Sequence, residues 1–202
     1  MKSKDFLINI AKDTLNILEH SKKYNVNGKT IDISQQIQKS IDQTVLYPPD
    51  FSFDSQIIRP KQKRQGHISI TNETTIAAAI RLVNNLKITQ EELVILNFAS
   101  GRTPGGAYKK GARTQEESLA RQTSLVASIE QERVRIMYKY NETIPGPLYS
   151  DYMIYTPGAI IIRDDNFSYL PEPILTSIIT SPAANLMFMR EEDRMEDINK
   201  AM

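Results

Sequence analysis

The sequence predicts an α/β fold in which a mixed sheet is flanked by helices. Strand-like and helix-like segments alternate through the middle of the chain, which is the pattern of domains built on a partly parallel sheet. Its length of 202 residues suits one domain. The hydrophobic fraction of 40% suffices for a core without a metal ion or a disulfide. One compact unit is therefore expected.

Two helices should precede the sheet. Apolar residues from Phe6 to Leu18 recur at the three- and four-residue spacing of an amphipathic helix, and Asn25–Gly28 has the composition of a turn. A second helix is expected over Ser34–Thr44, ended by Leu46–Pro49 because residues before proline avoid helical angles. Residues 1–60 are therefore interpreted as an N-terminal helical extension, and residues 61–202 as the main region.

The main region begins with a possible strand at His67–Ile70 and a helix at Thr74–Val83. Glu92–Phe98 is a nearly continuous apolar run, which is typical of a buried parallel strand. A long loop, Ala99–Arg113, then leads to a helix expected over Gln115–Ile129. Later strands are expected at Tyr152–Tyr155, Ala159–Arg163 and Ile174–Thr180, with a turn at Asp164–Asn166.

Composition excludes several kinds of chemistry. The chain has no cysteine, so a thiolate nucleophile, disulfides and cysteine-ligated zinc are excluded. Its two histidines, His20 and His67, belong to no metal-binding or Ser-His-Asp pattern. We therefore expect no metal or cofactor, and acid–base chemistry would fall to carboxylates.

Charge and hydropathy limit the expected partners and location. The 25 basic residues nearly balance the 24 acidic ones, so no overall field would attract nucleic acid or an anionic membrane. Acidic residues interrupt the apolar run that a signal peptide needs, and no segment has the length of a membrane span. We expect a soluble, cytoplasmic protein, and a monomer.

The loop Ala99–Arg113 is the best candidate for an anion-binding site. It has four glycines and four basic side chains but no acidic residue. Glycines let a backbone approach a phosphate closely, and free N–H groups at the start of the following helix point toward an anion. The loop matches neither the dinucleotide nor the P-loop motif, so this prediction depends on charge and position. The basic residues are Arg102, Lys109, Lys110 and Arg113.

Two adjacent acids, Glu116 and Glu117, follow this loop and allow two interpretations. Thr114 and Glu117 have the spacing of a capping box, and acids near a helix start gain roughly 0.3–1 kcal/mol each from the helix dipole. Alternatively, one carboxylate contacts ribose hydroxyls while the other protonates the leaving oxygen of a glycosidic bond and then activates water. Such an acid needs a raised pKa, which a like-charged neighbour favours. Spacing alone favours the cap and leaves both open.

Several segments resemble microbial-type poly(ADP-ribose) glycohydrolases, whose signature is a three-glycine loop followed after a short spacer by Gln-Glu-Glu. Around the loop these are Leu96–Ser100, Pro104–Ala107 and Gly111–Arg121. Elsewhere they are Thr71–Thr75, Ile154–Pro157, Ile162–Asp165 and Ile179–Asn185. The N-terminal helices also resemble the family's N-terminal region, so the similarity runs through nearly the whole chain.

The resemblance implies a macrodomain-like fold that hydrolyses ribose–ribose bonds and releases ADP-ribose, without a metal. Glu117 matches the catalytic acid/base and Glu116 the carboxylate that orients ribose hydroxyls. Gln115 is the first residue of the triplet, and the Gly105–Gly106 loop should pass around the diphosphate. The candidate substrate-binding residues are Gly105, Gly106, Ala107, Gln115, Tyr108, Asn97 and Ser100, with Tyr108 as a stacking group.

Two features depart from the family pattern. Ala107 stands where a third glycine is usual, which would cost on the order of 1 kcal/mol if that position needs a positive φ. Family members also continue through another strand and a second glycine-containing loop after the position of Asn185. Arg190–Met202 should be a helix leading into that part. We therefore expect the catalytic region to be incomplete at its C-terminal end.

Three functions remain open from the sequence. The leading one is a glycosidase acting on ADP-ribose polymer. A module that binds ADP-ribose without turnover is the second. The third is a hydrolase that removes single ADP-ribose groups from protein or nucleic acid. In each case the expected partner is an ADP-ribose polymer or an ADP-ribosylated macromolecule.

Overall fold

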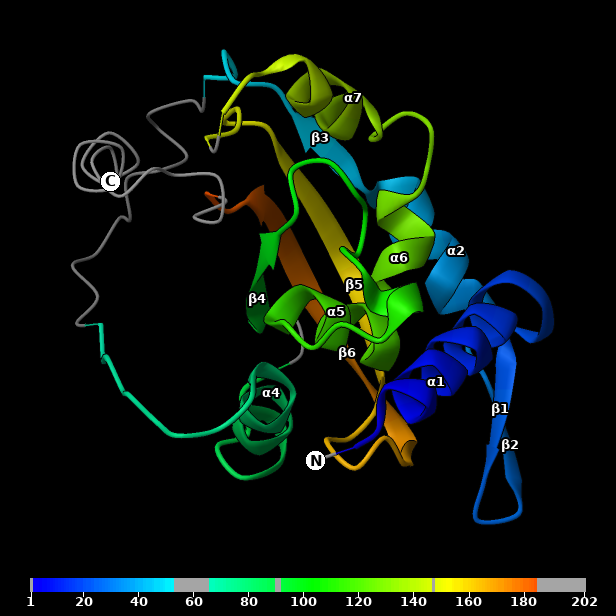
Figure 1. The fold of residues 1–202 in the computed structure, drawn as a ribbon. Helices are drawn as coiled ribbons and strands as arrows, with labels where there is room; N and C mark the ends of the chain where they lie inside the picture. The colour runs from blue at the N-terminus through cyan, green and yellow to red at the C-terminus, as the bar shows by residue number, and fades with distance from the viewer. Residues whose placement is uncertain (1, 53–65, 90–91, 147, 185–202) are drawn as a thin grey trace.

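A computed structural model describes residues 2–52, 66–89, 92–146 and 148–184 (Figure 1). Its centre is a four-stranded sheet in the order β3-β5-β6-β4. β4 pairs with β6 in parallel, whereas the other two pairings are antiparallel. The predicted mixed sheet with flanking helices is thereby confirmed. The strands are β3 (Val45–Tyr47), β4 (Val94–Ala99), β5 (Met153–Arg163) and β6 (Tyr169–Pro182).

The N-terminal region contains both predicted helices, α1 (Lys4–Asn16) and α2 (Ser34–Gln43). A π-type turn, Ile17–Ser21, extends α1. The predicted turn is confirmed, since Asn27 and Gly28 have φ of 51° and 75°. It joins two short strands that the sequence did not predict, β1 (Lys23–Val26) and β2 (Lys29–Asp32).

The N-terminal region is built into the main sheet. β3 pairs with β5, with Val45 opposite Tyr155, so residues interpreted as a helical extension also contribute a strand. Three residues before two prolines are too short to show a strand periodicity, which explains why the sequence did not predict β3. The expected boundary at residue 60 and the expected helix Arg190–Met202 lie outside the described residues.

The elements before the glycine-rich loop agree only partly with expectation. Helix α4 (Thr75–Asn84) and β4 are confirmed. The strand expected at His67–Ile70 is wrong: these residues have no strand partner within the described chain, and Ile68 and Ile70 are almost fully exposed. β4 is parallel as predicted, but it is buried on one face only: Ile95, Asn97 and Ala99 are buried, whereas Val94, Leu96 and Phe98 are exposed.

The single helix expected over Gln115–Ile129 is wrong: the structure has two helices there, α5 (Gln115–Gln122) and α6 (Leu125–Ile129). Between them the chain turns to pair with β5. The Ser124 N–H donates to Ile160 O at 2.9 Å, and Ser124 Oγ accepts from Ile160 N at 2.9 Å. These bonds to the sheet replace helical bonds, so the helix ends. A further helix, α7 (Ile136–Thr143), was not predicted.

Strands β5 and β6 form the long hairpin at the centre of the sheet. The two strands expected at 152–155 and 159–163 are one strand, with a register shift between Thr156 and Ala159 where Gly158 has a φ of 63°. The turn expected at Asp164–Asn166 is confirmed, because the Asn166 and Ser168 N–H groups both donate to Asp164 Oδ1 at 2.9 Å.

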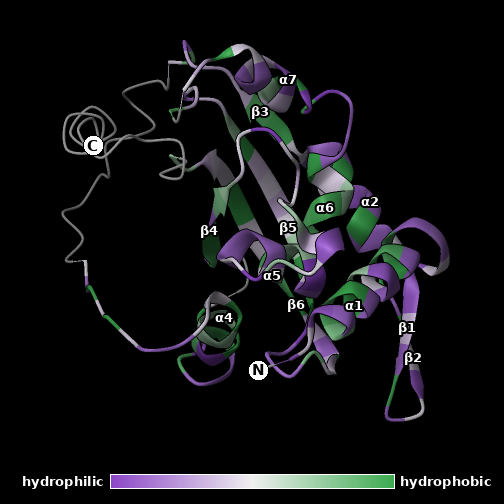
Figure 2. Cartoon of the chain, viewed as in Figure 1, coloured by the Kyte–Doolittle hydropathy of each residue, from purple (hydrophilic) through white to green (hydrophobic). Residues whose placement is uncertain are grey.

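Two clusters of buried apolar side chains hold these elements together. One joins β4, β5 and β6 to α4–α7, and the other joins β5 to α1, α2 and the base of the glycine-rich loop. Figure 2 shows hydrophobic residues on β4 and α6, whereas the β1–β2 hairpin is largely hydrophilic. Within the described residues, no helix combines the length and apolar character that a membrane span requires.

Candidate active site

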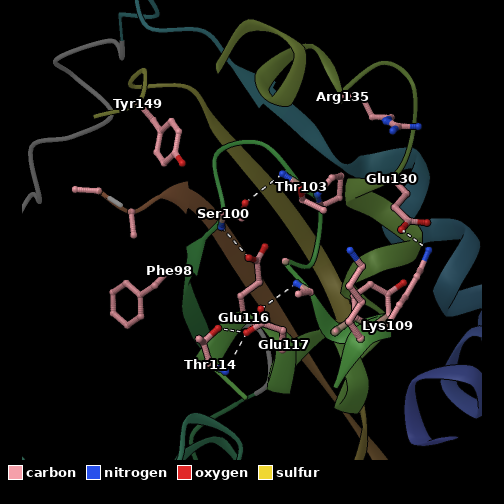
Figure 3. A pocket seen from close by; sticks show the side chains of 17 residues that line it. Phe98, Ser100, Thr103, Lys109, Thr114, Glu116, Glu117, Glu130, Arg135 and Tyr149 are labelled. Carbon is pink, nitrogen blue, oxygen red and sulfur yellow. Dashed lines mark hydrogen bonds and ion pairs between the residues drawn. The ribbon is translucent and has the colours of Figure 1, made fainter. Parts of the chain in front are cut away.

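A pocket lies where the loop after β4 turns back into α5, at the carboxyl end of the parallel pair β4 and β6. Open α/β sheets commonly bind ligands at this edge. Its volume is about 1030 Å³. Loop residues, both adjacent glutamates, the end of β6 and residues after α6 line it (Figure 3).

Glu116 points back under the loop and is only 2% exposed. Its Oε2 accepts a hydrogen bond from the Ser100 N–H at 2.7 Å, and its Oε1 accepts one from the Gly105 N–H at 3.1 Å. Burial raises the pKa of Glu116 to about 7; the charge of Glu117 adds to this rise, while the two N–H groups oppose it. A proton is therefore available on this carboxyl near neutral pH.

Glu117 caps the helix and faces the pocket at the same time. Its Oε2 accepts hydrogen bonds from the Thr114 N–H at 2.9 Å and from the Thr114 hydroxyl, and the first of these, with the Glu117 N–H donating to the Thr114 side chain, forms the capping box. Its Oε1 accepts one from the Ala107 N–H at 2.9 Å. The side chain is 6% exposed and lines the pocket. The two interpretations of this acid are therefore compatible, because the cap holds the carboxylate at the pocket wall.

Only glycine fits at position 106, because its φ is positive and because the neighbouring atoms leave no room for a Cβ. Its φ is +60°, and a Cβ at this position would lie 2.5 Å from Glu117 Oε1 and 3.0 Å from Glu116 Oε2. Gly105, with a φ of +71°, is similarly confined, since its Cβ would lie 2.9 Å from Cδ1 of Tyr108. Gly106 therefore lies against both carboxylates, and Gly105 lies against the Tyr108 ring.

Ala107 fits its position without strain. Its φ is −99°, so the positive φ that would have penalised alanine does not occur. Its methyl group lies at the exposed edge of the pocket while its N–H binds Glu117. The missing third glycine thus has no conformational cost here.

Ser100 and Asn97 support Glu116 from two sides. Ser100 lines the pocket, and its Oγ accepts hydrogen bonds from the N–H groups of Arg102 at 3.3 Å and Thr103 at 3.2 Å. Asn97 is fully buried on β4, where its Nδ2 donates to Thr180 Oγ1 at 3.2 Å. Its side chain also stabilises the ionised form of Glu116.

Two predicted substrate contacts have supporting positions instead. Gln115 does not line this pocket: its Nε2 donates to Leu96 O at 2.7 Å and its Oε1 accepts from the Phe98 N–H at 3.1 Å. Tyr108 contributes to the pocket wall, but it is only 1% exposed and packs in the core beneath Gly105, so little of its ring is accessible for stacking. The sequence could not show how far each of these two side chains reaches into the pocket, because this depends on how the loop packs.

The four basic side chains of the loop separate into two pairs. Lys109 and Lys110 line the pocket. Arg102 and Arg113 are directed elsewhere, because their guanidinium groups donate to Ile144 O at 3.3 Å and to Lys2 O at 2.7 Å. The local excess of positive charge at the pocket is thus smaller than the loop composition indicates.

Arg135 and Tyr149 line the pocket but were not predicted from the sequence. No local pattern in the sequence marks Tyr149; in the structure a Cβ at Gly101 would lie 2.5 Å from Cγ of its ring, so the glycine leaves room for the tyrosine. No local pattern marks Arg135, which immediately precedes α7. Within the part of the chain that the structure describes, no cluster of His, Asp and Glu side chains could hold a metal ion.

Comparisons with known proteins agree with this geometry. The family described as microbial-type PARG, catalytic domain, matches residues 11–164. No curated protein matches the chain. Poly(ADP-ribose) glycohydrolase from Thermomonospora curvata is similar in structure, with a TM-score of 0.85 and 32% identity over 97% of this chain and 70% of that chain.

Two ligand-bound structures are also similar. The Thermomonospora curvata enzyme bound to the inhibitor ADP-HPD has a TM-score of 0.81 and 33% identity, covering 97% of this chain and 69% of that chain. Poly(ADP-ribose) glycohydrolase from Deinococcus radiodurans in complex with ADP-ribose has a TM-score of 0.68 and 31% identity, over 87% and 67% of the two chains. With the fold, the glycine-rich loop and the paired glutamates all in agreement, the chain belongs to the family of microbial-type poly(ADP-ribose) glycohydrolases.

Proposed function

We propose that the chain hydrolyses the ribose–ribose O-glycosidic bond of poly(ADP-ribose) and releases ADP-ribose, with Glu117 as the catalytic acid/base. One observation carries this proposal. Glu116 and Glu117 are almost completely buried, yet both line one pocket, where three backbone N–H groups of the preceding loop hold their oxygens. Paired carboxylates held in this way suit glycoside hydrolysis.

The two carboxylates have different roles in this proposal. Glu117 donates a proton to the leaving oxygen as the bond to the ribose breaks, and then accepts a proton from the attacking water. Glu116 binds ribose hydroxyls and so sets the position of the sugar. Burial raises the pKa of Glu116 to about 7, so this neighbouring carboxyl still holds a proton over part of the neutral range.

The loop would hold the diphosphate of the released unit. Gly105 and Gly106 both have positive φ, which turns the backbone sharply around the carboxylates. Glycine-rich loops ahead of a helix start bind phosphate through backbone N–H groups and the helix dipole. A diphosphate beside Glu116 and Glu117 would favour their protonated forms by charge repulsion.

The test is the substitution Glu117→Gln. It should lower the rate of ADP-ribose release from polymer by at least about a hundredfold, because the amide cannot transfer the proton. Affinity for free ADP-ribose should change little, since the amide keeps the size and one acceptor oxygen. Release is measured by chromatography and affinity by calorimetry.

The matched control is Glu132→Gln, at an exposed acid paired with Lys139 outside the pocket, which should keep full activity. Undiminished release by the Glu117 variant would reject its catalytic role. If the unsubstituted chain bound ADP-ribose without cleaving polymer, the binding-module alternative would replace the enzyme. Cleavage of only mono-ADP-ribosylated protein or nucleic acid would favour the third function.

A further inference from the structure

The pocket extends beyond the carboxylates to a group of basic side chains. In Figure 3 Phe98 lies on one side of Glu116 and Glu117, and Lys109, Glu130 and Arg135 lie on the other. Lys109 and Lys110 belong to the 3₁₀ turn Tyr108–Lys110, and Arg135 precedes α7. We call Lys109, Lys110 and Arg135 the basic rim.

Only one of the three cations of the basic rim has an ion pair within the described residues. Glu130 is the acid beside it and pairs with Lys109 at 3.3 Å. The pocket wall as a whole has three cations and three acids, Glu116, Glu117 and Glu130, so its positive charge is gathered at the rim while two of the acids lie at the carboxylate end. Within the described residues, the Lys110 ammonium and the Arg135 guanidinium have no ion-pair partner, and both side chains are exposed. These two cations can therefore bind an anion without breaking an ion pair of the described residues, while the charge of Arg135 also acts on Glu132.

The substrate supplies anions on both sides of the bond that breaks. Each unit of the polymer carries a diphosphate, so one lies in the released unit and another in the unit that keeps the leaving oxygen. In the proposed function the loop around Gly105 and Gly106 holds the first. The leaving oxygen must lie at Glu117, whose carboxylate is held by the Ala107 N–H. Lys109 and Lys110 follow Ala107 along the wall of the same pocket.

We propose that the basic rim binds the diphosphate of the polymer unit on the leaving side of the bond. This inference rests on the proposed function and on the place of Glu117 in it. The contact exists only with polymer, because free ADP-ribose has no second unit. The rim thus strengthens substrate binding without retaining the product, and it favours polymer over a single ADP-ribose group.

The double substitution Lys110→Ala with Arg135→Ala tests the basic rim. The KM for polymer should rise on the order of tenfold, as expected for the loss of two exposed charge contacts. The kcat should stay within about twofold, because the lost contact binds the substrate and the transition state equally. The affinity for free ADP-ribose, measured by calorimetry, should also stay within about twofold. The rise in KM should shrink at high salt, since exposed charges are screened.

Two further variants define the direction of the effect. Lys139→Ala removes an exposed lysine that pairs with Glu132 outside the pocket, and it should leave the KM unchanged. Glu130→Gln frees Lys109 from its partner and adds one positive charge to the rim, so it should lower the KM for polymer.

The outcomes separate this inference from the proposed function. An unchanged KM in both the double variant and Glu130→Gln would overturn the proposal that the basic rim binds the polymer. An equal loss of affinity for polymer and for free ADP-ribose would also overturn it, because the rim would then serve the released unit. If the unsubstituted chain released no ADP-ribose from polymer, the proposed function would fail and the inference with it.

Discussion

At the scale of single residues, the site is determined by how closely a backbone approaches two carboxylates. Glu116 and Glu117 are held by the N–H groups of Ser100, Gly105 and Ala107 rather than by basic side chains. The backbone N–H groups lower the pKa of Glu116, but they add no formal charge, and burial outweighs them, so the pKa still rises to about 7. A lysine in their place would lower that pKa further.

The substitution Gly106→Ala should remove activity. Its Cβ would lie 2.5 Å from Glu117 Oε1, so the loop or the carboxylate must move, and we expect a fall in kcat of at least about a hundredfold, since misplacement by about 1 Å is that costly. The matched control is Gly158→Ala, which has a similar φ of +63° but no neighbour within 4 Å.

Both glycine variants should lose about 1 kcal/mol of stability from the strained φ, measured by denaturant unfolding. Only Gly106→Ala should lose activity. If Gly106→Ala kept full activity, or if Gly158→Ala were equally inactive, the close contact with the carboxylates would not be the cause.

At the scale of elements, α5 is fixed to β4 by a side chain that imitates a neighbouring strand. The Gln115 amide donates to Leu96 O and accepts from the Phe98 N–H, as the backbone of an adjacent strand would. Glu116 and Glu117 follow directly, so this attachment sets where both carboxylates begin. The resemblance identified Gln115 as part of the site. In the structure it does not line the pocket but attaches the start of α5 to β4.

The substitution Gln115→Met should therefore affect stability and activity together. Methionine keeps the length of the side chain but loses both hydrogen bonds, which should cost on the order of 0.5–1.5 kcal/mol each at most, because the two backbone groups are exposed and can bind water instead. The kcat should fall several-fold as the start of α5 loosens. Gln35→Met, at an exposed position in the first turn of α2, is the control and should change neither quantity. A kcat unaffected by Gln115→Met would limit this residue to a structural role.

At the scale of the whole molecule, the buried Glu116 links global stability to pH. Its pKa rises from 4.5 to about 7 on folding, mainly because burial disfavours the ionised form. Between these two pH values the folded chain binds more protons than the unfolded chain, so this group makes the free energy of unfolding fall as pH rises. The penalty is largest above pH 7, where the folded chain must bury the charge.

Glu116→Gln should remove this pH dependence. Relative to the unsubstituted chain, its Tm should rise progressively between about pH 5 and pH 8, corresponding to a difference on the order of 1–3 kcal/mol. The absolute Tm also reflects the exchange of an oxygen acceptor for an amide group, so the informative quantity is the change with pH. Thermal unfolding followed by circular dichroism measures it, and parallel Tm curves for the two proteins would contradict the raised pKa.

The sequence by itself determined the features that arise within a few consecutive residues. The spacing of apolar residues predicted α1, and local composition with the prolines after residue 47 predicted α4 and α2. The Thr114–Glu117 spacing predicted the capping box, and the glycines marked a loop that must approach other groups closely. The family resemblance added the roles of the glutamates. These interactions are local, so the residues involved are near one another in any fold that keeps the element.

Only the tertiary structure decided which segments meet across long stretches of chain. Pairing of Ser124 with Ile160 divides the long helix, and packing turns Tyr108 into the core. Arg135 reaches the pocket because α6 and the turn after it lie beside the loop, and nothing near Arg135 in the sequence indicates this. Such contacts depend on how whole elements pack, because each side chain takes the partner that the assembled sheet and helices bring within reach.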